Sequence, residues 1–191
     1  MTSKQKKPPQ GYGAVAIALH WLVALCIFGS LWLGFYMQAL PFSPRKLELY
    51  SWHKWLGVSI FLLVLLRLSW RLLRGAPAMV EGLSAQVRRW AAWGHRALYL
   101  LMVVMPLTGW LMSSALGVQT VWFGVLPLPN LLPKDKAVGE MLRTLHGLLA
   151  YGLIALIAGH VLAALKHQFL DRVPVLQRMG LAPSNTQETK T

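Results

Sequence analysis

Four long apolar segments constrain this chain more than any other feature of its sequence. Three of them are long enough to cross a bilayer, which takes about 20 predominantly apolar residues in a helix. We expect helices over residues 14–37, 52–73, 93–114 and 144–165. In a chain of 191 residues that is 55% hydrophobic and only 13% charged, this pattern predicts an integral membrane protein of the all-α class, folded as a four-helix bundle.

Two of these segments allow a second interpretation. The first follows several lysines and could be taken for a signal peptide, but its apolar run from Gly13 to Leu40 is too long and is interrupted by His20. The second has a continuous apolar stretch of only Trp55 to Leu66 and could be a core helix of a water-soluble protein. Because the other three segments can span, and an odd number of spans would separate the termini, we interpret it as a membrane helix.

Positive charge is distributed unevenly among the connections. Most of the 19 lysines and arginines lie at the N-terminus, between the second and third segments, or at the C-terminus. Because cytoplasmic loops are enriched in Lys and Arg, we expect both termini in the cytoplasm. The net charge of +13 is then a topology signal, and we expect no nucleic-acid partner. The positive residues of the opposite side are Arg45, Lys46, Lys54, Lys134, Lys136 and Arg143.

Four histidines lie within or at the edges of the apolar segments. An ionisable side chain is costly in a membrane and marks a functional site by default. With alternating helix directions, His20 and His160 lie near the cytoplasmic face, and His53 and His146 near the periplasmic face. His146 and His160 are 14 residues apart, which returns to within about 40° of the same helix face and separates them by about 21 Å. The fourth helix therefore offers one ligand at each of two levels.

The same spacing gives meaning to two further positions. Fourteen residues after His20 comes Gly34, which leaves room for a bulky planar group, and fourteen after His53 comes Arg67, which suits an anionic group such as a haem propionate. Two bis-histidine pairs predict two haems b. We expect iron ligation by His20 and His160 in an inner haem, and by His53 and His146 in an outer haem.

Covalent haem c, a zinc site and a proton relay are the alternatives to non-covalent haem. The sequence has no Cys-x-x-Cys-His, which excludes covalent haem c, and its one cysteine, Cys26, is expected to be a small core residue. A zinc site would gather its ligands at one level. A proton relay through the histidines is the stronger alternative. His95, near the cytoplasmic start of the third helix, has no partner at its depth, and we expect it to be interfacial or to bind a propionate.

Several short motifs run through the chain: His20-Trp21, His53-Lys54-x-x-Gly57, Arg67-x-x-x-Arg71, Gly94-His95-x-x-x-Tyr99, Lys166-His167-Gln168-Phe169-x-Asp171 and Leu176-x-Arg178-Met179. Together with His146 and His160, they resemble the bacterial cytochrome b561 family of di-haem membrane cytochromes. The resemblance implies non-covalent haem b at two levels and electron transfer between a periplasmic donor or acceptor and the quinone pool. One branch of that family oxidises superoxide and reduces ubiquinone, and a related branch supplies the cytochrome b subunit of hydrogenases.

We therefore expect a di-haem electron-transfer protein of a bacterial inner membrane in residues 1–182, followed by a disordered polar tail in residues 183–191. A quinone is the expected substrate at Lys166 and His167, because its carbonyl oxygens need donors and a proton source; a snorkelling Lys166 is the alternative. A membrane anchor for a partner enzyme, or a histidine-lined transporter without redox chemistry, remain alternatives for the whole chain. The residues expected around the haems are Arg67, Arg71, Gly34, Lys54 and His95.

Overall fold

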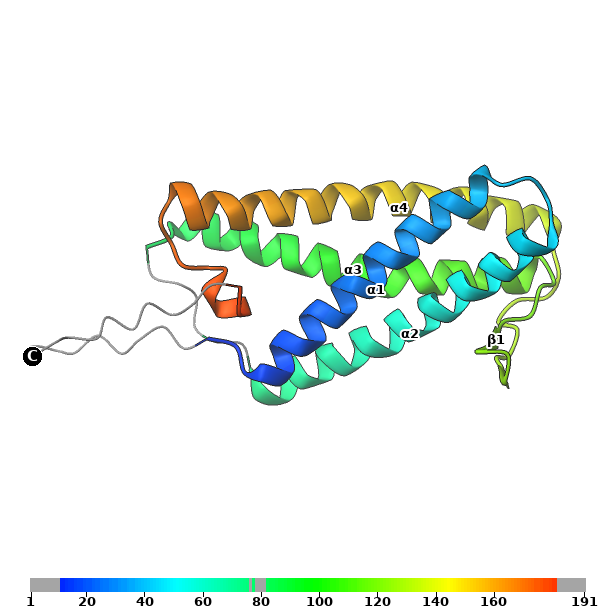
Figure 1. Ribbon diagram of the computed structural model, residues 1–191, viewed down its shortest axis with the longest axis horizontal. Helices are drawn as coiled ribbons and strands as arrows, with labels where there is room; N and C mark the ends of the chain where they lie inside the picture. The colour runs from blue at the N-terminus through cyan, green and yellow to red at the C-terminus, as the bar shows by residue number, and fades with distance from the viewer. Residues whose placement is uncertain (1–10, 76, 78–81, 182–191) are drawn as a thin grey trace, which may run out of the picture.

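The computed structural model describes residues 11–75, 77 and 82–181, and four long helices make up most of it. They lie side by side in an elongated bundle, with α1 against α2, α2 against α3 and α3 against α4 (Figure 1). Each is long and apolar enough to cross a membrane, so the predicted all-α membrane bundle is confirmed. The helices are α1 (Ala14–Ala39), α2 (Pro44–Arg74), α3 (Ala85–Ala115) and α4 (Lys136–Leu165).

Three of the helices begin about two turns earlier than the sequence predicted. Capping side chains fix these starts: Ser43 accepts from the backbone N–H of Lys46, and Asp135 accepts from two N–H groups at the start of α4. Ser84 caps α3 in the same way. The prediction was wrong because hydropathy reports only the part of a helix inside the hydrocarbon layer. A helix of 31 residues is about 46 Å long, well beyond the roughly 30 Å of that layer.

Both ends of the described chain meet at one end of the bundle, which we call the terminal end. The backbone N–H of Tyr12 donates to the carbonyl of Arg178 at 3.4 Å, and Trp21 Nε1 donates to the carbonyl of Met179 at 3.0 Å. The α1–α2 and α3–α4 connections lie at the opposite, loop end (Figure 1). Lys4, Lys6 and Lys7, which entered the topology prediction, and the predicted polar tail lie outside the described residues.

Side chains from all four helices pack at mid-bundle. Val23 and Val64 are almost completely buried there, and Cys26 packs against this cluster as a small, partly buried residue. Many large apolar side chains instead point away from the bundle; Leu25 and Trp32, for example, are 71% and 67% exposed. Such an outward apolar surface is expected where lipid, rather than water, is the solvent. The buried members of the central cluster are Val23, Ile27, Ile60, Val64, Met102 and Leu153.

Two short segments with secondary structure were not predicted. In the α3–α4 connection, β1 (Val121–Trp122) and β2 (Leu126–Pro127) pair as an antiparallel β-hairpin. After α4 the chain continues as one turn of the wider π-helix, η1 (Lys166–Leu170), followed by a short 3₁₀-helix, η2 (Gln177–Met179). Both are too short to leave a periodic hydrophobic pattern in the sequence.

Candidate functional site

At the loop end, α2 and α4 bring His53 and His146 together. Their ring centroids are 6.2 Å apart, with the ring planes at 84°. Nδ1 of His53 lies 3.1 Å from the carbonyl oxygen of Ser30 on α1. Nδ1 of His146 lies 3.0 Å from Oγ1 of Thr108 on α3. The two remaining helices therefore hold the rings that α2 and α4 present.

These contacts fix the protonation of both rings. A carbonyl can only accept, so Nδ1 of His53 is the protonated nitrogen. The Thr108 hydroxyl donates its single hydrogen to the carbonyl of Met105, at 2.8 Å, so its oxygen accepts from Nδ1 of His146. Nε2 of each ring is then unprotonated and can bind a metal, which is the arrangement usual for metal-bound histidines.

Two glycines make room for this pair. A Cβ on Gly34 of α1 would lie 3.3 Å from Cε1 of His53, and one on Gly109 of α3 would lie 3.2 Å from Cε1 of His146. Gly34 was predicted to face this level, and the structure places it there. Gly109 was not predicted. It follows His95 by 14 residues, the same spacing that led from His20 to Gly34, so the sequence could have indicated it.

At the terminal end, α1 and α4 bring His20 and His160 together, with ring centroids 6.4 Å apart. Nδ1 of His20 is buried and has no hydrogen-bond partner among the described residues. The expectation that His95 has no partner at its depth was wrong, since its ring lies 5.4 Å from that of His160. Because α3 begins at Ala85 and not near residue 93, His95 lies about 15 Å from the start of the helix, deeper than predicted.

The distance between ring centroids distinguishes the three histidine contacts. A metal bound at about 2 Å by two imidazole nitrogens on opposite sides places the ring centroids a little over 6 Å apart. The 6.2 Å and 6.4 Å pairs match this separation, whereas His95 and His160, at 5.4 Å, are too close to stand opposite each other across one ion. Within the described ranges no three His, Cys, Asp or Glu side chains form a group that could hold a metal ion. The histidines therefore fit two axial pairs.

A basic pocket borders the terminal-end pair. Arg67 and Arg71 of α2 both stand over the ring of Tyr99, at 5.5 Å and 5.8 Å, and neither forms an ion pair within the described part of the chain. They line a cavity of about 460 Å³ that also includes Tyr12 and Ala16, one turn before His20. Uncompensated guanidinium groups beside a histidine pair suit the carboxylates of a propionate-bearing cofactor.

Lys54, the residue after His53, lies at the loop end. Its Nζ donates to the carbonyl of Gln119 at 3.1 Å, and Oγ of Ser113 lies 3.5 Å away. Lys54 thus joins α2 to α3 and to the connection that follows it.

The two residues predicted for quinone binding share one carboxylate. Nζ of Lys166 lies 2.9 Å and 2.7 Å from the two oxygens of Asp171, and Nδ1 of His167 lies 2.6 Å from Oδ2. The hydrogen bonds from Lys166 and then His167 lower the pKa of Asp171 below its usual value. Beside them an apolar surface pocket of about 560 Å³ opens, lined by Leu162, Ala163, Leu165, Lys166, Phe169 and Leu170. His167 does not line it.

The sequence comparisons identify the family. The family model described as "Prokaryotic cytochrome b561" matches residues 11–181, which includes every helix and both histidine pairs. The chain belongs to this family. It is 33% identical over 175 residues to "Cytochrome b561 homolog 2" of Escherichia coli (strain K12), covering 90% of this chain and 92% of that protein. It is also 28% identical over 172 residues to "Probable superoxide oxidase CybB" of Yersinia pestis, covering 88% of this chain and 94% of that protein.

Family membership indicates which cofactor this chain binds. A prokaryotic cytochrome b561 is a membrane cytochrome that binds b-type haem and transfers electrons, and this one is a multi-pass bacterial membrane protein. The structure fits the cofactor, since each ring pair has the separation of an axial pair and the loop-end rings have their Nε2 atoms unprotonated. The assignment of individual residues as iron ligands stays a prediction.

Proposed function

We propose that this cytochrome holds two haems b, one between each histidine pair, and carries electrons between a periplasmic redox partner and the quinone pool. The observation that carries the proposal is the placement of two ring pairs, at 6.2 Å and 6.4 Å, toward opposite ends of α4. His146 and His160 place the two levels about 21 Å apart along that helix. By the distribution of positive charge, the terminal end faces the cytoplasm of a bacterial inner membrane.

Each residue near the pairs has a defined task in this proposal. Bound haem iron supplies one-electron redox chemistry. Ser30 and Thr108 orient the loop-end imidazoles, and Gly34 leaves the His53 ring its space. Arg67 and Arg71 compensate the negative charge of propionates at the terminal end. Together these residues would set ligand basicity and local charge, the two protein contributions that tune a haem's potential.

The terminal end also has the groups that a quinone requires. Lys166 carries ammonium donors for a carbonyl oxygen, and His167 with Asp171 forms a hydrogen-bonded pair that can exchange a proton with water. Reduction of a quinone to a quinol consumes two electrons and two protons, so a titratable pair at the cytoplasmic surface is suited to the reaction. The apolar pocket along Leu162 and Phe169 would take the isoprenoid chain.

We place the periplasmic substrate at the loop end. The Yersinia pestis relative is named a probable superoxide oxidase, and superoxide is an anion. At the loop end, Arg45 and Arg143 are ion-paired to glutamates, whereas Lys54 and Lys134 form no ion pair in the described ranges. These lysines would favour an anionic substrate near the loop-end pair. The second candidate, a membrane anchor for a partner enzyme, predicts that such an enzyme copurifies with the chain.

Haem stoichiometry tests the central claim. The purified protein should contain about two extractable haems b per chain and give a reduced-minus-oxidised spectrum of low-spin haem, since two bis-histidine pairs are available. One haem per chain would reject the two-level scheme. A colourless, haem-free protein that still folds would favour the transporter.

The quinone site has its own test. In His167→Ala with both haems retained, oxidation of the reduced haems by a short-chain ubiquinone, followed by stopped flow, should slow at least several-fold. Arg89→Ala is the matched control, because Arg89 is an exposed cation in the first turns of α3. Equal rates in the His167 variant and the unmodified protein would reject the site and leave the haem assignment standing.

A further inference from the structure

We propose that the β-hairpin from Val121 to Pro127 is embedded in the bilayer beside α2 and contacts lipid, although it belongs to a connection between helices. The hairpin lies alongside the loop-end half of α2, not beyond the end of the bundle (Figure 1). Three observations carry this: its depth, its backbone pairing and its exposed apolar surface.

Depth follows from two tryptophan side chains. Trp122 Nε1 donates to Oγ of Ser59, at 3.3 Å, and Trp55 Nε1 donates to the carbonyl of Val121, at 2.7 Å. Ser59 is six residues beyond His53, so it lies about 9 Å further from the loop end. The hairpin therefore folds back along α2 to the level of the loop-end histidine pair, which lies inside the membrane-spanning segment.

Part of the hairpin backbone is paired internally, which lowers the cost of placing non-helical chain in a bilayer. Val121 pairs with Pro127 and Trp122 with Leu126, and the N–H groups of Gly124 and Val125 donate to the carbonyls of Val121 and Trp122. Pro127 has no backbone N–H that would need a hydrogen-bond partner.

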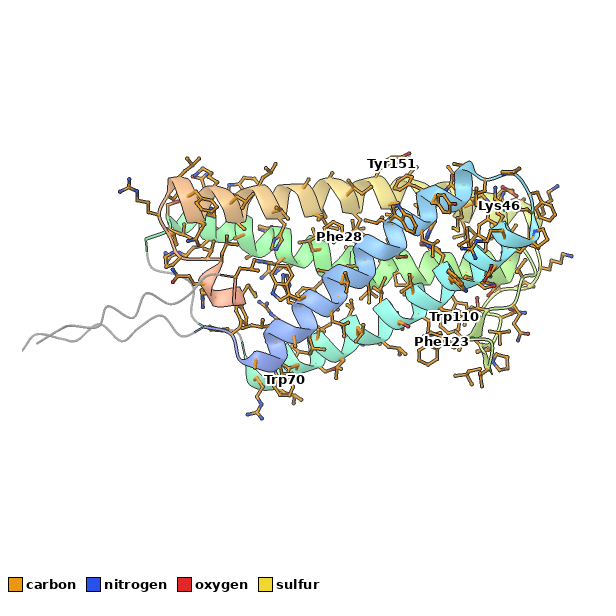
Figure 2. The ribbon with its side chains drawn as sticks, in the orientation of Figure 1. Phe28, Lys46, Trp70, Trp110, Phe123 and Tyr151 are labelled. Carbon is orange, nitrogen blue, oxygen red and sulfur yellow. The ribbon has the colours of Figure 1, made fainter. Side chains whose placement is uncertain are left out.

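The outward surface of the hairpin is apolar. Val125, Phe123 and Leu126 are 83%, 58% and 51% exposed, and no charged residue occurs between positions 117 and 133. Figure 2 shows Phe123 on the outer side of α2, away from the helices of the bundle. Phe123 has a φ of 51°, unusual for a residue other than glycine, and its ring contacts those of Trp55 and Trp122 at 5.4 Å and 5.2 Å. The aromatic contacts hold the turn in that conformation.

Lipid is the occupant that fits all three observations. Indole rings with one bonded N–H and an apolar body favour the interfacial layer of a bilayer, and Trp55 and Trp122 both have this arrangement. A water-soluble partner would have to reach the hairpin at the depth of Ser59, through lipid. Lipid would then border this side of α2 at the level of the loop-end pair.

The polarity around the hairpin tests the proposal directly. In a Cys26→Ser background, Val125→Cys is labelled with a bimane fluorophore, and the haem-loaded protein is placed in phospholipid vesicles. Lys134→Cys, an exposed position in the same connection, is the matched control. The Val125 label should emit at shorter wavelength, be quenched by nitroxide-labelled lipids and resist iodide, and the Lys134 label should behave in the opposite way.

Equal quenching of both labels by iodide would overturn the proposal and place the hairpin in water. Shielding of the Val125 label from both iodide and nitroxide lipids would also overturn it, because a protein would then cover the surface. Leu126→Cys provides a second labelling site if Val125→Cys fails to retain haem. The haem spectrum of each variant shows that the fold is intact.

Discussion

The two histidine pairs of this cytochrome have similar ring separations but different surroundings. At the loop end, Ser30 and Thr108 each bind an Nδ1 atom, so neighbouring helices fix both rings. At the terminal end, the Nδ1 atom of His20 is buried without a partner in the described chain, and a third histidine, His95, lies against His160. The loop-end site is thus oriented by the protein alone, whereas the terminal-end site depends more on what it binds.

Charge separates the two sites further. Arg67 and Arg71 lie beside the terminal-end pair, and no ion pair compensates them in the described ranges. Positive charge stabilises the electron-rich, reduced form of a nearby redox centre. If the terminal end receives electrons from the loop end and passes them to a quinone, a higher potential at the arginine-bordered site assists that direction of flow.

Removal of one ligand from each pair should have the largest effect. His146→Ala and His160→Ala should each lose one of the two haems or convert it to a high-spin form, because one axial ligand remains. The two variants should lose different components of the reduced-minus-oxidised spectrum. His53→Ala should match His146→Ala, and His20→Ala should match His160→Ala. If His20→Ala and His53→Ala gave the same spectral loss, the pairing would be wrong.

Filling the space beside a loop-end ring should be nearly as damaging. In Gly109→Val the new side chain meets the His146 ring, since even a Cβ would lie 3.2 Å from Cε1. We expect loss of the loop-end haem with the terminal-end haem retained, measured by spectral titration. Gly29→Val is the matched control, because nothing lies within 4 Å of a Cβ at that position of α1. Full haem content in Gly109→Val would show that the ring is free to move.

Loss of an orienting hydrogen bond should have an intermediate effect that only the loop-end site can show. Thr108→Val removes the acceptor for Nδ1 of His146. Loss of such a partner typically costs 10–100-fold in metal affinity, and a less basic imidazole should raise the potential of that haem. Thr144→Val, an exposed threonine bonded to the carbonyl of Glu140, is the control. Unchanged haem retention and potential in Thr108→Val would remove the contrast between the two sites.

The smallest effect concerns pH at the terminal end. Hydrogen bonds from Lys166 and His167 lower the pKa of Asp171 below its ordinary 3.8. A carboxylate with a lowered folded-state pKa stabilises the fold above its unfolded pKa, and the stabilisation disappears as pH falls through the lowered value. Asp171→Asn should therefore reduce thermal stability slightly at pH 7, and the difference should shrink as the pH falls below 3.8. A difference between the two proteins that persists in acid would show that the residue acts by packing instead.

The sequence determined the helix number, the two levels and the predicted histidine partners. A helix has a fixed rise and rotation per residue, so the spacing of 14 residues placed His146 and His160 on one face without any tertiary information. Gly34 followed from the same count. Most of the motifs behind the family resemblance likewise lie within single helices, where spacing along the chain translates directly into position.

Only the tertiary structure decided what depends on the rotation and offset of one helix against another. It brought His95 against His160, placed Gly109 beside His146, and chose Ser30 and Thr108 as the partners of the loop-end rings. A spacing rule cannot give these contacts, because hydropathy locates a helix only to within a turn or two. The β-hairpin was not predicted for the same reason. Its position on α2 depends on the side chains of Trp55 and Trp122, which join segments more than 60 residues apart.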